Sequence, residues 1–153
     1  MDIESIKLIV SDFDGVMTDN SVYLDETGLE MVRVSRADGQ GINLLRDKGI
    51  EVIILSTEEN TVVKKRALKL KVECVQGIKD KAAAFLLICK DKGLQPKEVA
   101  YVGNDINDYE AMKLAGLKIV PNDAYDEVIK IADIVTNTKG GRGVIREIAS
   151  LIC

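Results

Sequence analysis

The sequence contains no histidine among its 153 residues. This absence excludes Ser-His-Asp and Cys-His catalysis, phosphohistidine chemistry and zinc sites built on histidine ligands. Any catalysis by this chain has to use carboxylates, lysines, hydroxyls and hard metal ions, which narrows the search for an active site.

Other features are scarce, and each scarcity excludes a class of protein. The three cysteines, Cys74, Cys89 and Cys153, have no paired spacing, which favours reduced thiols over a disulfide framework. No apolar run approaches the ~18 residues of a membrane-spanning helix. Residues 1–4 are acidic and lack the apolar core of a signal peptide. We therefore expect a cytoplasmic protein that does not contact a membrane.

The chain has no excess of positive charge, since it contains 21 Lys and Arg residues and 25 Asp and Glu residues. The net charge is −4 at pH 7, whereas a general nucleic-acid binder usually carries a basic stripe, so no nucleic-acid partner is expected. Hydrophobic residues make up 46% and charged residues 30% of the chain, which is the balance of an ordinary soluble globular protein. A chain of this length is expected to form one domain, over residues 1–153.

The segment 6–20 contains the strongest signal in the chain. Residues 6–10 are mostly apolar and β-branched, which predicts a short buried strand. Because side chains alternate along a strand, we expect Asp12 and Asp14 to point the same way at its carboxyl end, with Phe13 in the core. Ligands bind at that end of the strands in open α/β sheets, although the same residues also occur in solvated turns.

Strands and helices alternate along the chain, which predicts a three-layer α/β fold with helices on both faces of a parallel sheet. The later strands are predicted at residues 51–55, 72–75, 99–102, 117–120 and 134–135. The helices are predicted at residues 38–48, 60–70, 80–93, 109–115, 126–132 and 143–152. These elements use nearly the whole chain, so no cap domain is expected over the sheet edge.

Residues 22–24 and 31–34 flank a polar turn that contains Gly28, which predicts a β-hairpin inserted after the first strand. The hairpin falls between the acidic strand end and the first helix, so we expect it to project beside the site. Its apolar Val, Leu and Met side chains are expected to be buried against another surface. We interpret the hairpin as a contact between the subunits of an oligomer.

In a parallel sheet the carboxyl ends of the strands meet at one edge, which brings several weak signals together. These are Asp12 with Asp14, Ser56 with Thr57, Lys81, and the Asn/Asp-rich turn 104–108. Taken singly, Ser56 is better explained as a helix cap, and the turn is explained equally well as only a turn. Taken together and in this order, they favour the chemistry of phosphoryl transfer.

Phosphoryl transfer at such an edge requires a cation. A phosphate dianion near the Asp12 carboxylate meets two unit repulsions of roughly 4 kcal/mol each at 4 Å and an effective dielectric of 20. A set of oxygen ligands without histidine suits Mg²⁺. Lys81 and Ser56 would hold the other phosphate oxygens while Asp12 attacks phosphorus. Asp14 would protonate the leaving oxygen and then activate water.

These segments resemble the four motifs of the haloacid dehalogenase (HAD) superfamily of phosphatases, which have a Rossmann-like fold. Further segments resemble its capless branch, the phosphatases of 3-deoxy-D-manno-octulosonate 8-phosphate and of nonulosonate 9-phosphates; they lie at residues 14–19, 38–42, 76–81 and 140–147. The resemblance implies Asp12 as nucleophile, Asp14 as acid and base, and Lys81 on the phosphate. It also implies a homotetramer whose hairpins meet centrally and whose subunits help to close one another's sites.

The resemblance also suggests the positions that bind substrate and metal. The phosphate- and substrate-binding positions are Gly39, Ser56, Thr57, Glu58, Arg66, Lys69 and Lys81. The Mg²⁺ ligands are Asp12, Asp14, Asn104 and Asp105. The family's metal-binding acid after the glycine is Asn104 in this chain, which ligates without charge, and Asp105 or Asp108 could compensate.

Glu58 distinguishes between two substrate groups. The octulosonate enzymes usually follow this strand-end hydroxyl with Gly-Arg, whereas Thr57-Glu58 looks more like the nonulosonate group. Our first hypothesis is therefore a Mg²⁺-dependent phosphatase of an eight- or nine-carbon 2-keto-3-deoxy sugar acid, such as an N-acylneuraminate 9-phosphate, acting through an aspartyl phosphate. The alternatives are another capless sugar-phosphate phosphatase and a non-catalytic assembly module of the kind found in some sialate cytidylyltransferases.

Overall fold

A computed structural model describes residues 3–153 and shows one six-stranded parallel sheet with the strand order β5-β4-β1-β6-β7-β8. Its strands are β1 (Leu8–Ser11), β4 (Glu51–Leu55), β5 (Glu73–Val75), β6 (Val99–Val102), β7 (Leu117–Val120) and β8 (Ile134–Val135). Residues 1 and 2, part of the acidic N-terminal segment noted above, lie outside the described residues. The predicted parallel sheet is confirmed, with β1 in its middle.

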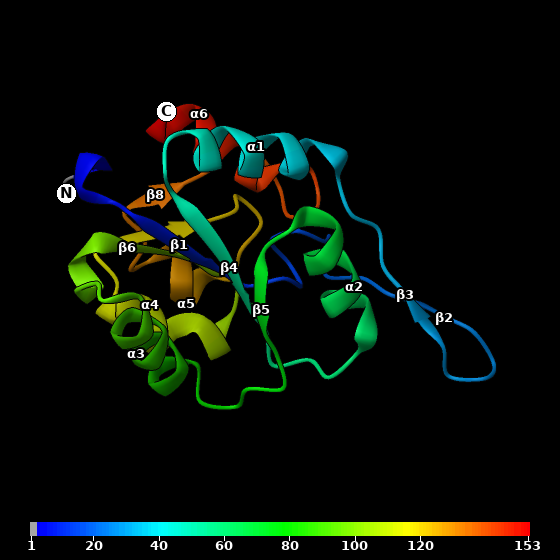
Figure 1. Ribbon diagram of the computed structural model, residues 1–153. Coiled ribbons are helices and arrows are strands. Elements are labelled where there is room, and N and C mark those ends of the chain that lie inside the picture. Colours follow the sequence, from blue (N-terminus) through cyan, green and yellow to red (C-terminus); the bar gives the residue numbers. More distant parts are fainter. Residues whose placement is uncertain (1–2) are drawn as a thin grey trace.

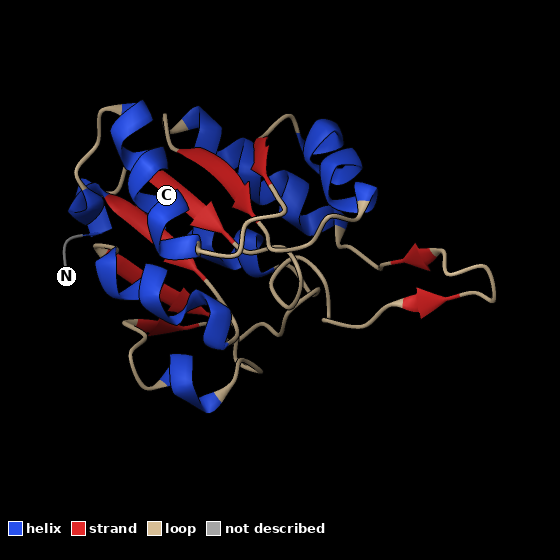
Figure 2. Cartoon of the chain, turned by 90° about the horizontal axis from the view of Figure 1, so that it is seen from below, coloured by secondary structure: helices blue, strands red, loops and turns tan. Residues whose placement is uncertain are grey.

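Helices cover both faces of this sheet, as Figures 1 and 2 show. One face carries α1 (Arg36–Asp47), α2 (Thr61–Leu70) and α6 (Val144–Ile152). The other carries α3 (Lys81–Lys92), α4 (Tyr109–Leu114) and α5 (Asp126–Ile129). Alternation along β1 separates the two cores, because Ile9 packs on the first layer while Leu8 and Val10 pack on the second. The three-layer fold is as predicted, and residues 3–153 contain no cap domain.

The strands predicted at residues 51–55, 99–102, 117–120 and 134–135 have the observed bounds, and no other boundary differs from its prediction by more than three residues. The first strand was predicted at residues 6–10 and runs instead over Leu8–Ser11. The first helix begins two residues earlier than predicted, because the Ser35 side chain accepts a hydrogen bond from the Ala37 N–H at 3.2 Å and caps it. Helix α5 ends at Ile129 and not at residue 132, because the following turns are closed by i→i+3 bonds.

Asp38 connects the first and last helices of the chain. Its side chain is buried in the first turn of α1, and its Oδ1 accepts a hydrogen bond from the Ile145 N–H in α6 at 3.1 Å. Burial raises the pKa of Asp38 to about 6, although the bonds from the α6 backbone oppose that shift. The motif at residues 38–42 therefore joins two elements that are far apart in sequence.

The predicted hairpin is present and projects from the body of the molecule (Figure 1). Its strands are shorter than predicted, β2 (Tyr23–Leu24) paired antiparallel with β3 (Glu30–Met31). Its exposed apolar side chains are Val22, Tyr23, Leu24, Leu29 and Met31. Among the helices described, none is long and apolar enough to cross a membrane.

Candidate active site

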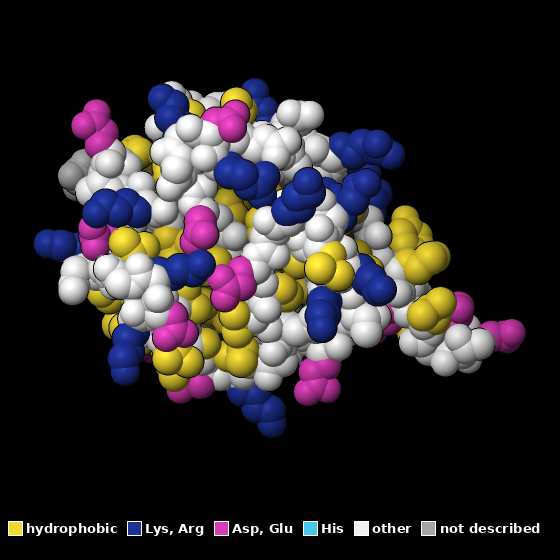
Figure 3. Space-filling view, viewed as in Figure 1, with side chains coloured by type: hydrophobic (Ala, Val, Ile, Leu, Met, Phe, Trp, Pro, Cys, Tyr) yellow, Lys and Arg dark blue, Asp and Glu magenta, His cyan; other side chains and the backbone are white. Residues whose placement is uncertain are grey.

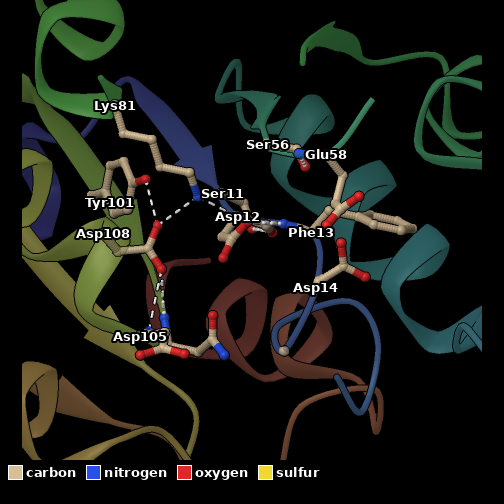
Figure 4. A network of polar contacts seen from close by, with 12 residues as sticks. Ser11, Asp12, Phe13, Asp14, Ser56, Glu58, Lys81, Tyr101, Asp105 and Asp108 are labelled. Carbon is tan, nitrogen blue, oxygen red and sulfur yellow. Dashed lines mark hydrogen bonds and ion pairs between the residues drawn. The ribbon is translucent and has the colours of Figure 1, made fainter. Parts of the chain in front are cut away.

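The carboxyl ends of β1, β4 and β6 lie together at one edge of the sheet. Ser11 is in register with Ile54 on one side and with Val102 on the other. The residues that follow these strands therefore surround Asp12 (Figure 4). The predicted meeting of the strand ends at one edge of the sheet is therefore confirmed.

Asp12 lies at the centre of this edge and is almost fully buried. It continues the alternation of Leu8 and Val10, so its side chain faces the layer of α3 while Phe13 enters the opposite core. Its Oδ1 accepts a hydrogen bond from the Phe13 N–H at 2.8 Å and lies 3.0 Å from Lys81 Nζ. Burial, followed by the charge of Asp108, raises the pKa of Asp12, and Lys81 counteracts that rise.

Lys81 is the first residue of α3, which Asp80 caps through the Ala83 N–H at 3.0 Å. Its Nζ is buried between two carboxylates, 3.0 Å from Asp12 and 2.8 Å from Asp108. Burial alone would lower the pKa of Lys81, but the two acids outweigh burial and raise it. A buried ammonium group therefore lies beside the predicted nucleophile, where it can also contact a phosphate oxygen.

Asp108 organises the turn, a role that the sequence analysis did not assign to it. Its Oδ1 accepts hydrogen bonds from Lys81 Nζ and Tyr101 Oη, both at 2.8 Å. Its Oδ2 accepts from the Asn104 N–H at 2.9 Å and the Asp105 N–H at 3.4 Å. Both oxygens are thus occupied within the protein. The signal was available as an Asp-x-x-Asp capping pattern at the start of a 3₁₀ helix (Ile106–Asp108).

Asn104 brings a side-chain amide to the same point. One terminal atom of this amide lies 3.0 Å from both the Asp14 main-chain oxygen and Asp12 Oδ2. As nitrogen, that atom donates hydrogen bonds to both oxygens; as oxygen, it completes a group of three oxygens of the kind that Mg²⁺ binds. Gly15 permits this approach, because a Cβ there would lie 1.9 Å from Asn104 Nδ2.

Only one side-chain carboxylate contributes to that group of oxygens. Within residues 3–153, no three Asp, Glu, His or Cys side chains are arranged to hold a metal ion. Asp105 Oδ1 instead accepts the Ile106 N–H at 2.6 Å and caps the short helix. The oxygens that fit a hard cation are therefore Asp12 Oδ2, the Asp14 carbonyl and the Asn104 amide oxygen.

Asp14 is half-buried and lies apart from the Asp12 side chain. We expected the two carboxylates to point the same way, but β1 ends at Ser11 and the chain turns from Phe13 onward, so strand alternation no longer applies. Figure 4 shows Asp14 on the side of Glu58, away from Lys81. Burial, followed by the charge of Glu58, raises the pKa of Asp14, which suits a group that donates a proton.

Ser56 is buried at the end of β4, and its Oγ accepts the Glu58 N–H at 3.1 Å. Its hydroxyl hydrogen is left for another acceptor, and the half-buried Thr57 follows it. A cavity of about 240 Å³ beside Asp14 is lined in part by Glu30 and Glu58. A second cavity, of about 340 Å³, is lined by Gly15, Asp19, Asn20, Ser21, Asn104, Asp123 and Tyr125. No Lys or Arg lines either of these two cavities.

Three predicted substrate-binding residues, Gly39, Arg66 and Lys69, lie elsewhere. They line a separate cavity of about 390 Å³ between α1 and α2, which we call the basic groove. Its other lining residues are Arg36, Gln40, Asn43, Arg46, Leu70 and Lys71. Figure 3 shows Lys and Arg side chains gathered over these helices. The structure therefore does not bring these three residues to the catalytic edge of the same chain.

Comparisons with known proteins agree with this architecture. Residues 65–148 match the family of haloacid dehalogenase-like hydrolases. The 3-deoxy-D-manno-octulosonate 8-phosphate phosphatase KdsC of Salmonella typhi is 35% identical over 150 residues, which cover 97% of this chain and 80% of that protein.

Solved structures show the same fold. A Streptomyces avermitilis protein assigned to the HAD hydrolases has a TM-score of 0.95 at 45% identity, covering 99% of this chain and 87% of its own. The 3-deoxy-D-manno-octulosonate 8-phosphate phosphatase of Moraxella catarrhalis, solved with magnesium, phosphate and KDO, has a TM-score of 0.94 at 30% identity, covering 98% and 87%. Together with the family match, these similarities show that the chain belongs to the haloacid dehalogenase-like hydrolases.

Proposed function

We propose that this chain is a Mg²⁺-dependent phosphatase of a 2-keto-3-deoxy sugar acid with eight or nine carbons. The observation that carries the proposal is the buried contact of Asp12 with Lys81, next to the oxygens around Asn104. The KdsC relatives, 35% identical over nearly the whole chain, support the substrate class. The magnesium, phosphate and sugar acid in the Moraxella catarrhalis structure support both the metal and the ligand.

The reaction divides between the two acids. The Asp12 carboxylate attacks phosphorus, the ester P–O bond breaks, and Asp14 gives its proton to the leaving sugar oxygen. Asp14, now a carboxylate, takes a proton from water, which attacks the aspartyl phosphate and releases phosphate. Lys81 donates hydrogen bonds to the phosphoryl oxygens throughout. Bound Mg²⁺ would offset the negative charge of Asp12 and phosphate, held by Asp12, the Asp14 carbonyl and Asn104.

Asn104→Asp is expected to tighten Mg²⁺ binding about tenfold, or ~1.4 kcal/mol, because it adds a charge to a site with a single carboxylate. Calorimetric titration of the metal-free protein with Mg²⁺ measures the change. Asp105→Asn is the matched control and should leave the affinity unaltered, since Asp105 caps the short helix. Unchanged or weaker binding in Asn104→Asp would remove Asn104 from the ligand set.

Within the substrate class, we favour the nine-carbon sugar acids. Glu58 follows Ser56 by two residues and lines the cavity beside Asp14, together with Glu30. A carboxylate of the substrate would be repelled there, whereas a hydroxyl- or amine-bearing tail could donate hydrogen bonds to the two carboxylates. An arginine at this position would reverse that preference.

A turnover panel of eight- and nine-carbon ulosonate phosphates tests this choice, with Glu58→Arg measured beside the unaltered protein. We expect the unaltered protein to favour the nine-carbon esters. The ratio of kcat/KM should shift toward the eight-carbon ester by about tenfold in the variant, or ~1.4 kcal/mol. Glu59→Arg, one residue along the same loop, is the control and should leave the ratio alone. Phosphate release from a generic ester but from none of these would favour another capless sugar-phosphate phosphatase. Release from no ester at all would favour the non-catalytic assembly module.

We also propose a homotetramer built on residues 22–34. Five apolar side chains of the hairpin are 47–67% exposed in the single chain, and a second copy would cover them. No Lys or Arg lines the cavity beside Asp14 or the one beside Asn104, whereas Arg66 and Lys69 line the basic groove on another face. A neighbouring subunit could present these cations to the sugar-acid carboxylate. A monomer in light scattering at micromolar concentration would contradict the assembly.

A further inference from the structure

Tyr101 lies directly beneath the catalytic edge and has no part in the reaction described above. It is fully buried in β6, and its neighbour in β1 is Val10, two residues before Asp12. Its hydroxyl donates to Asp108 Oδ1 at 2.8 Å. The same oxygen accepts a hydrogen bond from Lys81 Nζ, also at 2.8 Å. Tyr101 and Lys81 therefore share one acceptor atom.

The ring of Tyr101 is held independently of its hydroxyl. It packs edge-to-face on Phe85, with ring centroids 5.9 Å apart and an interplanar angle of 68°. Phe85 lies four residues after Lys81 in α3, on the same helix face. Removing only the hydroxyl should therefore leave the ring and α3 in place.

The protonation of these groups fixes the direction of the hydrogen bonds. Burial, followed by the charges of Asp108 and Asp12, raises the pKa of Tyr101, so its hydroxyl stays protonated and donates. Asp108 Oδ2 is already occupied by two backbone N–H groups. Lys81 contacts Asp12 and Asp108 and has a third N–H left for phosphate.

We propose that Tyr101 is a positioning residue for Lys81. Its hydroxyl donates one of the two side-chain hydrogen bonds that Asp108 Oδ1 accepts. The Lys81 ammonium group therefore remains shared between Asp108 and Asp12. Without the hydroxyl, Asp108 is left with one donor on Oδ1 and draws Lys81 toward itself, away from Asp12 and from the incoming phosphate. The residue acts on catalysis through Lys81 and does not contact the substrate.

Tyr101→Phe tests the proposal with a generic aryl phosphate ester at saturating Mg²⁺. We expect kcat to fall about tenfold while KM changes less than twofold, because the ammonium group matters most as charge develops in transfer. Ile88→Ala is the control: it truncates a side chain in the same hydrophobic core, so it should lower the melting temperature, but it removes no hydrogen-bonding group of this network. Its kcat should stay within twofold of the unaltered protein. If Tyr101→Phe and Ile88→Ala lose the same stability and have the same kcat, the Tyr101 hydroxyl has only a structural role.

A second measurement does not depend on turnover. The side-chain ¹⁵N signal of the Lys81 ammonium, assigned by its loss in Lys81→Met, should shift in Tyr101→Phe and stay in place in Ile88→Ala. An unmoved Lys81 signal would overturn the proposal. The generic ester separates this result from the choice of sugar acid: a chain that cleaves the aryl ester but no ulosonate phosphate fails only the proposed substrate class.

Discussion

Replacing Asp12 with asparagine is expected to abolish phosphate release, with a loss of about 10⁴-fold or more in kcat. The amide is not a nucleophile toward phosphorus, so the covalent step cannot begin. The fold should survive, because the amide oxygen can still accept the Phe13 N–H and Lys81 keeps its ion pair with Asp108. The substitution also removes a buried negative charge that Asp108 repels.

The measurement is phosphate release by Asp12→Asn at saturating Mg²⁺, read beside its thermal unfolding and circular dichroism. Asp91→Asn is the matched control. It makes the same chemical change at an exposed residue of α3, remote from the catalytic edge. The control should keep full activity. Turnover above one-tenth of normal in Asp12→Asn would mean that another group attacks phosphorus.

The position of the catalytic edge could be predicted because strand topology decides it. Parallel strands bring their carboxyl ends together, so Asp12, Ser56 and the turn after β6 had to meet once the strands were recognised. Lys81 joins them because α3 packs on the face toward which Asp12 points. These contacts follow from the alternation of side chains along the strands and from the order of strands and helices along the chain.

Other parts of the site depend on local geometry that periodicity does not encode. The direction of Asp14 follows from the turn after Ser11, where the chain leaves the strand. The role of Asp108 depends on four donors that arrive from the loop, β6 and α3. The separation of the basic groove from the cavities beside Asp14 and Asn104 depends on where α1 and α2 lie relative to each other. Of these, only the capping of the turn by Asp108 has a pattern in the sequence, and that pattern does not predict its contacts with Lys81 and Tyr101.

The Gly-Gly segment at residues 140–141 illustrates a motif whose role only the structure reveals. The Gly140 N–H donates to Asp123 Oδ1 at 2.9 Å, and the Gly141 N–H donates to the Val16 carbonyl at 3.0 Å. A Cβ on Gly140 would lie 2.1 Å from the Gly15 main-chain oxygen and 2.9 Å from that of Thr18. The segment before α6 thus supports the loop that carries Asp14.

Gly140→Ala is therefore expected to destabilise the protein by about 2–4 kcal/mol, because the three atoms nearest to the new methyl group all belong to the main chain and cannot rotate away. Relief of the clash has to move the Asp14 loop, so kcat should fall with stability. Urea unfolding followed by circular dichroism measures the change in free energy. Gly39→Ala is the control: it lies inside α1, its new methyl group would meet only Leu70 Cδ2 at 3.6 Å, and alanine in a helix stabilises by roughly 0.5–1 kcal/mol. If the free energy of unfolding of Gly140→Ala is within ~0.5 kcal/mol of that of the unaltered protein, the segment accommodates a side chain and does not hold the Asp14 loop in place.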